Sequence, residues 1–313
     1  MKLAFVFPGQ GSQKVGMGAD LYEGFSQARE VYEEASEVLG FDVASLSFRG
    51  PAEELDLTIN TQPCLLTAEY AAFRVLDAEG ARPSYVAGHS LGEYTAAVVS
   101  GALGFSSALK LTRHRAKLMQ EAVPAGKGMM AAILGLPGSA VDEVCAGLTR
   151  GYARAANYNC PGQIVISGET EAVREAMALA GEKGAKKAIP LQVSVPSHSR
   201  LMEGAAEKLS EFFLSSGVVI NSPAIPLVSN VDAVVLKGAE EVRDALVRQL
   251  SNPVRWEQGL KAIREAGAET FIEVGPGKVL SGLIKRTLPD CPFFNVEDRQ
   301  SLQKTLSALA DLS

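Results

Sequence analysis

The pentapeptide Gly88-His-Ser-Leu-Gly92 has the residue types and spacing of a serine nucleophile. It fits the pattern G-x-S-x-G, in which the serine occupies a sharp turn between a strand and a helix. Apolar residues 85–87 precede the turn and the alanine-rich segment 93–99 follows it, so the sequence predicts that context. Two glycines are expected because such a turn brings backbone segments too close for a Cβ atom. The alternative is an ordinary strand-to-helix turn in which Ser90 only caps the helix.

A turn of this kind stabilises negative charge next to the serine. Ser90 precedes the predicted helix, where free N–H groups and the helix dipole favour an anion. The main-chain amide of Leu91 would then point toward the oxyanion that forms when the serine attacks a carbonyl carbon. Together these features predict nucleophilic catalysis at Ser90.

Serine needs a partner that accepts its proton, usually a histidine. The chain contains three histidines. His89 adjoins the nucleophile, and its side chain should point away from that of Ser90, whereas His114 lies on the polar face of a predicted helix. His198 lies in the loop that follows residues 126–193, which we interpret below as a small domain inserted into a larger one. We therefore predict that His198 is the base; the alternative is a histidine in a surface loop.

The third member of a triad is not evident. Hydrolases with this turn run Ser, then Asp or Glu, then His along the chain. The acidic residues between Ser90 and His198 lie mostly in predicted helices, and none follows a strand in the expected way. We expect a backbone carbonyl or an amide side chain to orient His198, an arrangement that suits group transfer.

An arginine interrupts the apolar face of the helix predicted for residues 105–122. At 100° per residue, one face collects Lys110, Arg113, His114, Lys117 and Glu121. The opposite face contains Arg115 among Ala108, Leu111, Leu118, Met119 and Ala122. A guanidinium that faces the interior stays charged and needs an anionic partner. Three interpretations remain open: a site for an anionic ligand, an internal ion pair, or a side chain that extends to water.

Strands alternate with helices along most of the chain, which predicts an α/β fold with a parallel sheet covered on both faces. The large domain is expected to be α/β-hydrolase-like and to comprise residues 1–125 and 194–313. Its glycine-rich loop, Pro8–Gln13, follows the first strand and should line the ligand crevice. Strands are predicted at 3–7, 85–87, 225–229, 270–274 and 293–296, and helices at 20–39, 62–78, 93–99, 105–122, 200–215, 240–250, 256–266, 278–288 and 299–312.

Residues 126–193 have a different pattern, strand-helix-strand-strand-helix-strand in fewer than about seventy residues, which is typical of a ferredoxin-like domain. The strands are predicted at 129–135, 152–158, 163–168 and 185–192, with a turn at 159–162, and the helices at 139–148 and 170–182. We interpret this segment as a small domain inserted into the larger one.

Composition narrows the function classes. A chain of 313 residues that is 47% hydrophobic can form a large core and a second small domain. The net charge of −6, with scattered Lys and Arg, argues against nucleic acid or an anionic membrane as the partner. Four widely spaced cysteines indicate neither a zinc site nor a redox pair and fit a reducing compartment. Because no signal peptide or long apolar run is present, we expect a soluble cytoplasmic protein.

Six motifs together resemble the malonyl-CoA:acyl carrier protein transacylases of bacterial type II fatty acid synthesis. The resemblance extends in order over essentially the whole chain, including the small inserted domain. The motifs are Pro8-Gly-Gln-Gly-Ser-Gln, Gly88-His-Ser-Leu-Gly-Glu, Arg115-Ala-Lys-Leu-Met-Gln, Val195-Pro-Ser-His198, Gln249-Leu-Ser-Asn-Pro-Val and Glu273-Val-Gly-Pro-Gly.

The resemblance implies a ping-pong transfer. Ser90, deprotonated by His198, would attack the thioester of malonyl-CoA and form a malonyl-enzyme, and the phosphopantetheine thiol of holo acyl carrier protein would then take the malonyl group. Arg115 would bind the free malonyl carboxylate through two hydrogen bonds. The pair Pro196-Ser197 before the histidine resembles stand-alone transacylases of fatty acid synthesis, so malonyl is expected rather than methylmalonyl.

Further roles also follow from the resemblance. The amides of Gln10 and Leu91 would form the oxyanion hole, and Gln249 would orient the histidine through its main-chain carbonyl. The residues expected to line the site are His89, Asn157 and Asn159. No cofactor or metal is expected, since malonyl-CoA is a substrate, and we expect a monomer because nothing indicates an obligate assembly.

Two alternatives remain open at the level of sequence. A serine hydrolase or thioesterase would use the same turn, although the missing acidic residue and the presence of Arg115 argue against it. A carrier-protein-binding module without activity would not need Ser90, His198 and Arg115 to be intact.

Overall fold

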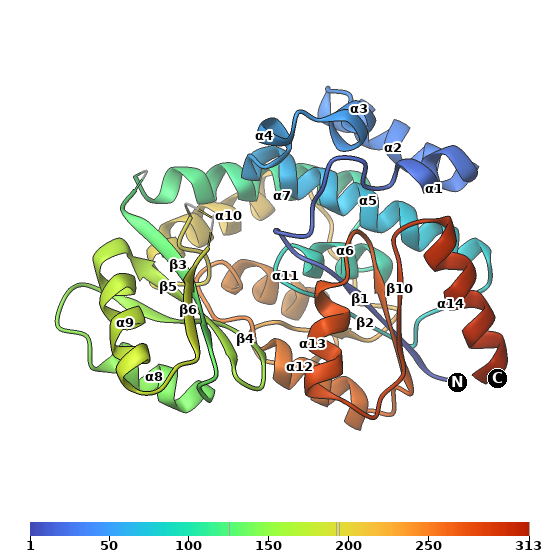
Figure 1. Ribbon diagram of the computed structural model, residues 1–313. Helices are drawn as coiled ribbons and strands as arrows, with labels where there is room; N and C mark the ends of the chain where they lie inside the picture. Colours follow the sequence, from blue (N-terminus) through green and yellow to red (C-terminus); the bar gives the residue numbers. More distant parts are fainter. Residues whose placement is uncertain (125, 192, 194, 313) are drawn as a thin grey trace.

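The computed structural model describes residues 1–124, 126–191, 193 and 195–312. Its strands form two sheets, a six-stranded sheet of order β10-β9-β1-β2-β7-β8 and a four-stranded sheet of order β4-β5-β3-β6. Figure 1 shows the four-stranded sheet with α8 (Gly138–Ala146) and α9 (Thr170–Glu182) on one side of the molecule and the six-stranded sheet on the other.

The six-stranded sheet is parallel except at one edge, which confirms the predicted α/β class. Every residue of its central strand, β1, is buried, because helices cover both faces of the sheet. The short edge strand β8 runs antiparallel to β7 and was not predicted. The strands are β1 (Leu3–Phe7), β2 (Tyr85–Gly88), β7 (Leu227–Val228), β8 (Val235–Leu236), β9 (Thr270–Val274) and β10 (Phe293–Val296).

Helices surround this sheet, and several differ from their predicted bounds. The helix predicted at 20–39 is two helices, because Phe25 is extended and ends the first one. The helix predicted from residue 62 begins four residues earlier, at Thr58, and holds Pro63 in its interior. The helices are α1 (Ala19–Gly24), α2 (Ser26–Leu39), α3 (Val43–Arg49), α4 (Ala52–Leu55), α5 (Thr58–Ala78), α6 (Gly92–Val99), α7 (Phe105–Ala122), the 3-10 turn η1 (Arg200–Met202), α10 (Glu203–Ser215), α11 (Ala239–Arg248), α12 (Trp256–Glu265), α13 (Val279–Thr287) and α14 (Arg299–Leu312).

The four-stranded sheet is antiparallel throughout and packs one face against α8 and α9. The turn predicted at 159–162 is tighter, because β4 continues through Cys160. The last strand, predicted at 185–192, is β6 and spans only Lys187–Pro190. Gln192, and the expected boundary residues Ala125 and Ser194, lie outside the described residues. The other strands are β3 (Gly128–Leu134), β4 (Ala153–Cys160) and β5 (Gln163–Glu169).

Backbone hydrogen bonds also join the four-stranded sheet to the segment that follows α11. The N–H of Tyr158 in β4 donates to the carbonyl of Val254, and the N–H of Val254 donates to the carbonyl of Ala156. This parallel bridge fixes β4 against the segment between α11 and α12. Over the residues that the structure describes, no helix combines the length and apolar character needed to cross a membrane.

Candidate active site

The strand, turn and helix predicted around Ser90 are present as β2, residues 89–91 and α6. Both glycines are required by close approach. A Cβ atom on Gly88 would lie 1.8 Å from the carbonyl carbon of Gly92, and one on Gly92 would lie 2.1 Å from the carbonyl oxygen of Phe7. Ser90 itself has φ 53°, a left-handed conformation that is costly for a residue with a side chain. The turn is therefore built to present one serine at the end of β2.

His198 lies beside that serine. Its Nε2 is 2.8 Å from Ser90 Oγ, and its Nδ1 is 2.7 Å from the main-chain oxygen of Gln249. Because a carbonyl oxygen only accepts, Nδ1 carries the proton and Nε2 is left to accept one from the serine. Burial, followed by the nearby positive charge of Arg115, lowers the pKa of His198 to about 3. The imidazole is therefore neutral near pH 7, which is the form that a general base needs.

The Gln249 carbonyl occupies the place that a carboxylate takes in a hydrolase triad. Gln249 follows α11, is fully buried, and also donates from its side-chain Nε2 to the Ser90 carbonyl at 2.8 Å. A neutral acceptor orients the histidine without adding negative charge beside it. His198 is further held by its own N–H, which donates to the carbonyl of Leu250 at 2.9 Å.

Arg115 reaches Ser90 from α7 and is only 1% exposed. Its NH2 group lies 3.3 Å from Ser90 Oγ and 2.8 Å from Gln249 Oε1, and NH1 lies 2.9 Å from Gln62 Oε1. The interpretation that it extends to water is wrong, because the side chain is buried. Within the described chain no carboxylate lies within ion-pair distance of the guanidinium, and Nε has no hydrogen-bond partner.

The two residues expected to form an oxyanion hole, Gln10 and Leu91, lie at the cavity that contains Ser90. Gln10 follows β1, and Leu91 follows Ser90 at the start of α6. The main-chain N–H of each residue would have to face the oxyanion. In the described part of the chain neither amide N–H donates a hydrogen bond. The side chain of Gln10 is fixed separately, by donation from Nε2 to Thr58 Oγ1 at 3.1 Å.

The four-stranded sheet contributes two asparagines. Asn159 Oδ1 lies 2.8 Å from His89 Nε2, so the ring of His89 turns toward β4 and not toward Ser90. That ring also makes an edge-to-face contact with Trp256, with the ring centroids 5.4 Å apart. Asn157, two residues earlier in β4, lines the cavity without a side-chain hydrogen bond in the described chain. His89 and Asn159 therefore brace the turn, whereas Asn157 has its polar groups available.

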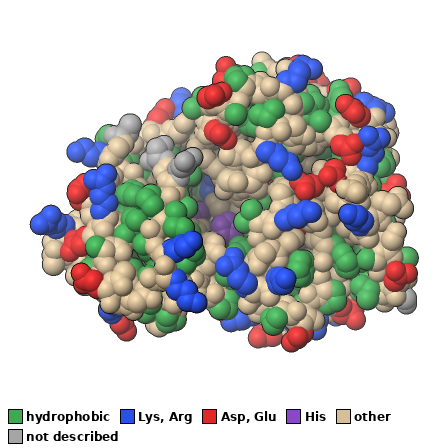
Figure 2. Space-filling model, viewed as in Figure 1, with side chains coloured by type: hydrophobic (Ala, Val, Ile, Leu, Met, Phe, Trp, Pro, Cys, Tyr) green, Lys and Arg blue, Asp and Glu red, His purple; other side chains and the backbone are tan. Residues whose placement is uncertain are grey.

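These residues surround one cavity of about 240 Å³ between the two sheets. Figure 2 shows the hollow, with histidine atoms visible inside it. Besides the polar groups, its wall includes apolar side chains from the four-stranded sheet, from the segment after β6 and from α13: Met130, Val165, Leu191, Val193, Val279, Leu280 and Leu283. The described residues hold no group of three or more His, Cys, Asp or Glu side chains placed to share a metal ion.

Sequence reasoning missed three residues that hold the site together. Asn230 accepts the Ser90 N–H, Gln62 binds Arg115, and Glu93 accepts from Gln249 Nε2 at 2.5 Å. Asn230 follows β7, which is the neighbour of β2, so its place at the carboxyl end of a parallel strand was a usable signal. Glu93 lies within the Gly88-His-Ser-Leu-Gly-Glu motif, and burial raises its pKa to about 7.

Comparison with known proteins shows to which family the chain belongs. Residues 4–304 match the family model described as the acyl transferase domain. The chain belongs to this acyl transferase family. The names of its relatives confirm the similarity to malonyl-CoA:acyl carrier protein transacylases that the six motifs indicate.

Relatives of this acyl transferase match over almost their full length. It is 46% identical over 312 residues to the malonyl CoA-acyl carrier protein transacylase of Bacillus subtilis (strain 168), covering 99% of this chain and 98% of the relative. It is 48% identical over 287 residues to the protein of the same name from Escherichia coli (strain K12), covering 91% and 92%. A malonyl-transacylase solved in complex with its type II PKS acyl-carrier protein superimposes with a TM-score of 0.95 at 46% identity, covering 98% of this chain and 100% of that one.

Proposed function

We propose that this protein transfers a malonyl group from malonyl-CoA to the phosphopantetheine thiol of holo acyl carrier protein, through a malonyl-serine intermediate. The observation that carries the proposal is the buried guanidinium of Arg115, 3.3 Å from the nucleophile and bound to the neutral side-chain oxygens of Gln62 and Gln249. A buried charge of this kind is stabilised when an anion completes its surroundings. The carboxylate at the far end of a malonyl thioester has the required charge and shape.

In the first half of the reaction, Ser90 Oγ attacks the thioester carbonyl carbon while its proton passes to His198 Nε2. The carbonyl oxygen becomes an oxyanion and accepts hydrogen bonds from the amides of Leu91 and Gln10. The imidazolium that forms is stabilised through Nδ1–H by the Gln249 carbonyl. When the tetrahedral intermediate collapses, the carbon–sulfur bond breaks and CoA leaves as a thiol with the proton from His198.

The second half reverses these steps with a different thiol. His198 Nε2 takes the proton of the phosphopantetheine thiol, and the sulfur attacks the malonyl-serine ester carbon. Collapse breaks the ester bond, and Ser90 regains its proton from the imidazolium. Arg115 holds the malonyl carboxylate during both halves, so the acyl group keeps one orientation while the thiols exchange.

The same proposal includes the finer architecture. Residues 1–125 and 194–313 would form an α/β-hydrolase-like catalytic domain, and residues 126–193 a ferredoxin-like domain inserted into it. The strand-helix-strand-strand-helix-strand order and the antiparallel order β4-β5-β3-β6 support the second assignment. We further propose that the enzyme acts in the cytoplasm as a monomer, that neither nucleic acid nor a membrane is its partner, and that it uses no metal or other cofactor.

The test is the intact mass of the protein after a short incubation with malonyl-CoA and no acceptor. We expect one added malonyl group that persists, that is absent in Ser90→Ala, and that holo acyl carrier protein removes. Steady release of CoA without a mass increase would mean that water is the acceptor, and a hydrolase would replace the transferase. An adduct on Ser90→Ala would place the nucleophile elsewhere.

A further inference from the structure

Asn230 supports the nucleophile turn from behind the cavity. It lies in the loop between β7 and β8 and is 3% exposed. Its Oδ1 accepts the N–H of Ser90 at 2.8 Å, and its Nδ2 donates to the carbonyl of Gly88 at 2.6 Å. Its own main-chain N–H donates to Glu93 Oε1 at 3.0 Å. One residue therefore contacts the end of β2, the nucleophile and the first turn of α6.

The turn depends on such support because its backbone is strained. Among the described residues, three that are not glycine have a positive φ: Ser90 at 53°, His198 at 61° and Ala233 at 55°. A left-handed conformation at a residue with a side chain persists only where its surroundings hold it. The Ser90 N–H precedes α6 and has no partner within the helix, so without Asn230 a buried donor would be unsatisfied.

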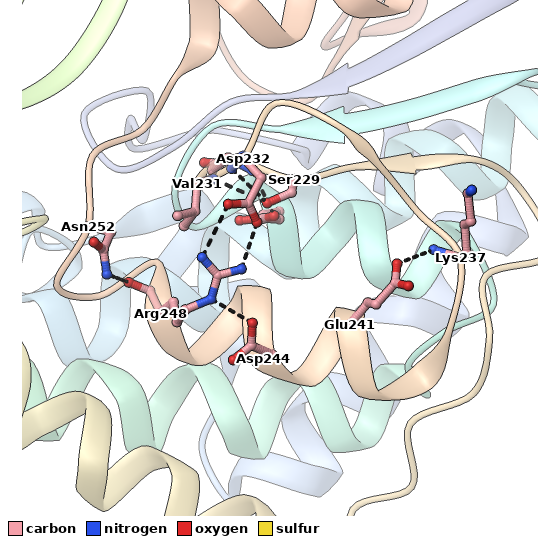
Figure 3. A network of polar contacts seen from close by, with 10 residues as sticks. Ser229, Val231, Asp232, Lys237, Glu241, Asp244, Arg248 and Asn252 are labelled. Carbon is pink, nitrogen blue, oxygen red and sulfur yellow. Dashed lines mark hydrogen bonds and ion pairs between the residues drawn. The ribbon is translucent and has the colours of Figure 1, made fainter.

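The loop that carries Asn230 is fixed in turn by an ion pair. Arg248 at the end of α11 binds both carboxylate oxygens of Asp232, at 3.2 and 2.6 Å, and its Nε lies 2.5 Å from Asp244 Oδ2. Figure 3 shows the guanidinium between these two carboxylates. Ser229 Oγ accepts from the N–H groups of Val231 and Asp232, which closes the loop on itself.

Arg248 also directly precedes Gln249, the residue that orients His198. The Asp232–Arg248 pair thus connects two segments: the loop that holds the Ser90 backbone and the helix end whose carbonyl accepts from His198. The side chain of Gln249 closes the connection from the inside, because its Nε2 donates both to the Ser90 carbonyl and to Glu93. The relative position of Ser90 and His198 therefore depends on contacts made outside the cavity.

We propose that Asn230 is a positioning residue for the transfer reaction, and that the Asp232–Arg248 pair fixes its place relative to Gln249. The inference rests on the proposed acyl transfer at Ser90. Asn230 does not belong to the described residues that line the cavity, so we assign it no contact with substrate. Its loss should misplace the serine relative to its base and oxyanion donors, which lowers kcat, and should leave the KM for malonyl-CoA nearly unchanged.

The first experiment uses two substitutions of Asn230 and two readouts. For Asn230→Ala we expect kcat to fall about 10- to 100-fold with KM within about twofold. The rate at which a fluorophosphonate labels Ser90 should fall to a similar extent, because labelling needs the placed serine but no malonyl recognition. Normal kcat in a folded Asn230→Ala, or a change confined to KM, would overturn the proposal.

Asn230→Asp distinguishes activity lost because Ser90 is misplaced from activity lost because the protein unfolds. The substituted side chain keeps an acceptor for the Ser90 N–H, but when ionised it has no donor for the Gly88 carbonyl and repels it. Protonation restores that donor, so the activity of this variant relative to the wild type should rise as the pH falls. A ratio that does not change with pH would contradict the role assigned to the Gly88 contact. This arm decides the question if Asn230→Ala does not fold.

The ion pair is tested with a matched control. Arg299, at the start of α14, binds Asp20 with Nε and NH2 at 2.7 and 2.6 Å and does not line the cavity. Arg248→Ala should lower kcat severalfold, and Arg248→Lys should lower it less. Arg299→Ala should lower the melting temperature about as much as Arg248→Ala does but leave kcat unchanged. Equal effects of Arg248→Ala and Arg299→Ala would refute a positioning role for the Asp232–Arg248 pair.

The labelling arm also distinguishes this inference from the proposed function. If the wild-type protein transfers no malonyl group but its Ser90 is labelled, and Asn230→Ala slows the labelling, the substrate assignment fails and the positioning role stands. If the wild type transfers malonyl normally and Asn230→Ala is equally active, only the positioning role fails.

Discussion

The six-stranded and four-stranded sheets meet at one cavity, but they supply different kinds of groups. Gln10, Ser90 and Asn230 each follow a parallel strand of the larger sheet, at the edge where strands end and helices begin. The smaller sheet is antiparallel, so successive side chains alternate between its two faces. Ile133 and Ile166 pack toward α8 and α9, whereas Met130 and Val165 line the cavity.

The difference follows from sheet geometry. The carboxyl edge of a parallel sheet collects free amides and helix N-termini, which suit developing negative charge. One face of an antiparallel sheet instead gives a broad apolar surface. The larger sheet would therefore perform the chemistry, and the smaller sheet would shape the space in which the thioester lies. Four predictions test this contrast, in order of decreasing consequence for the protein.

The turn at Ser90 should tolerate an added methyl group far less than a helix beside the smaller sheet does. Gly88→Ala places a Cβ against the backbone of Gly92, so we expect a loss of unfolding free energy of about 3 kcal/mol or more and loss of transfer activity. Gly181→Ala in α9 is the matched control, since no atom outside its own helix and its chain neighbours lies within 4 Å of its Cβ position. This substitution should raise the free energy of unfolding by about 0.5–1 kcal/mol. Chemical denaturation measures both. Equal effects would refute the contrast.

Arg115→Ala should reduce malonyl transfer by about 100-fold or more, because a carboxylate would be buried without its partner. Acetyl transfer by the same variant serves as the control, since an acetyl group has no carboxylate to lose. Steady-state kinetics with the two CoA esters gives the ratio. Similar losses with both acyl groups would mean that Arg115 supports Ser90 or Gln249 and does not select the substrate.

The pH profile should report the environment of His198. Its pKa lies below the ordinary value of 6.5, so the imidazole stays neutral, and able to accept a proton, down to a lower pH than an exposed histidine. The acid limb of kcat/KM is therefore expected well below pH 6.5. In Arg115→Ala, assayed with acetyl-CoA, removal of the positive charge should move this limb upward. An acid limb at or above pH 6.5 in the wild type would contradict the proposal that the buried, neutral His198 is the base.

The smallest effect is expected on the apolar wall. Met130→Ala removes a side chain that lines the cavity, and we expect KM for malonyl-CoA to rise about three- to tenfold with kcat unchanged. Ile133→Ala on the same strand points to the opposite face and should lower stability by about 2–5 kcal/mol without changing KM. A fall in kcat for Met130→Ala would show that the smaller sheet also positions reacting atoms.

Much of the site could be predicted because its signals are local. The strand and helix around Ser90 follow from two glycines and the flanking apolar residues. The helix Phe105–Ala122 has the predicted bounds, and its 3.6-residue period places Arg115 on the buried face. Prediction was weaker at helix ends. The pattern at 20–39 predicted one helix, which Phe25 divides into two, and the helix predicted from residue 62 begins at Thr58.

Other features depend on contacts between residues far apart in the chain. Asn230 meets Ser90 because β7 pairs with β2, and 140 positions separate the two residues. The carbonyl that accepts from His198 belongs to Gln249, which follows α11. Every residue has a main-chain carbonyl, so residue type gives no signal, and only the resemblance to a known family indicated Gln249. Turns and helical periodicity depend on residues that are close together in the sequence, so the sequence alone predicts them. The order of strands in the sheet decides which distant side chains meet, and that order arises only when the whole core packs.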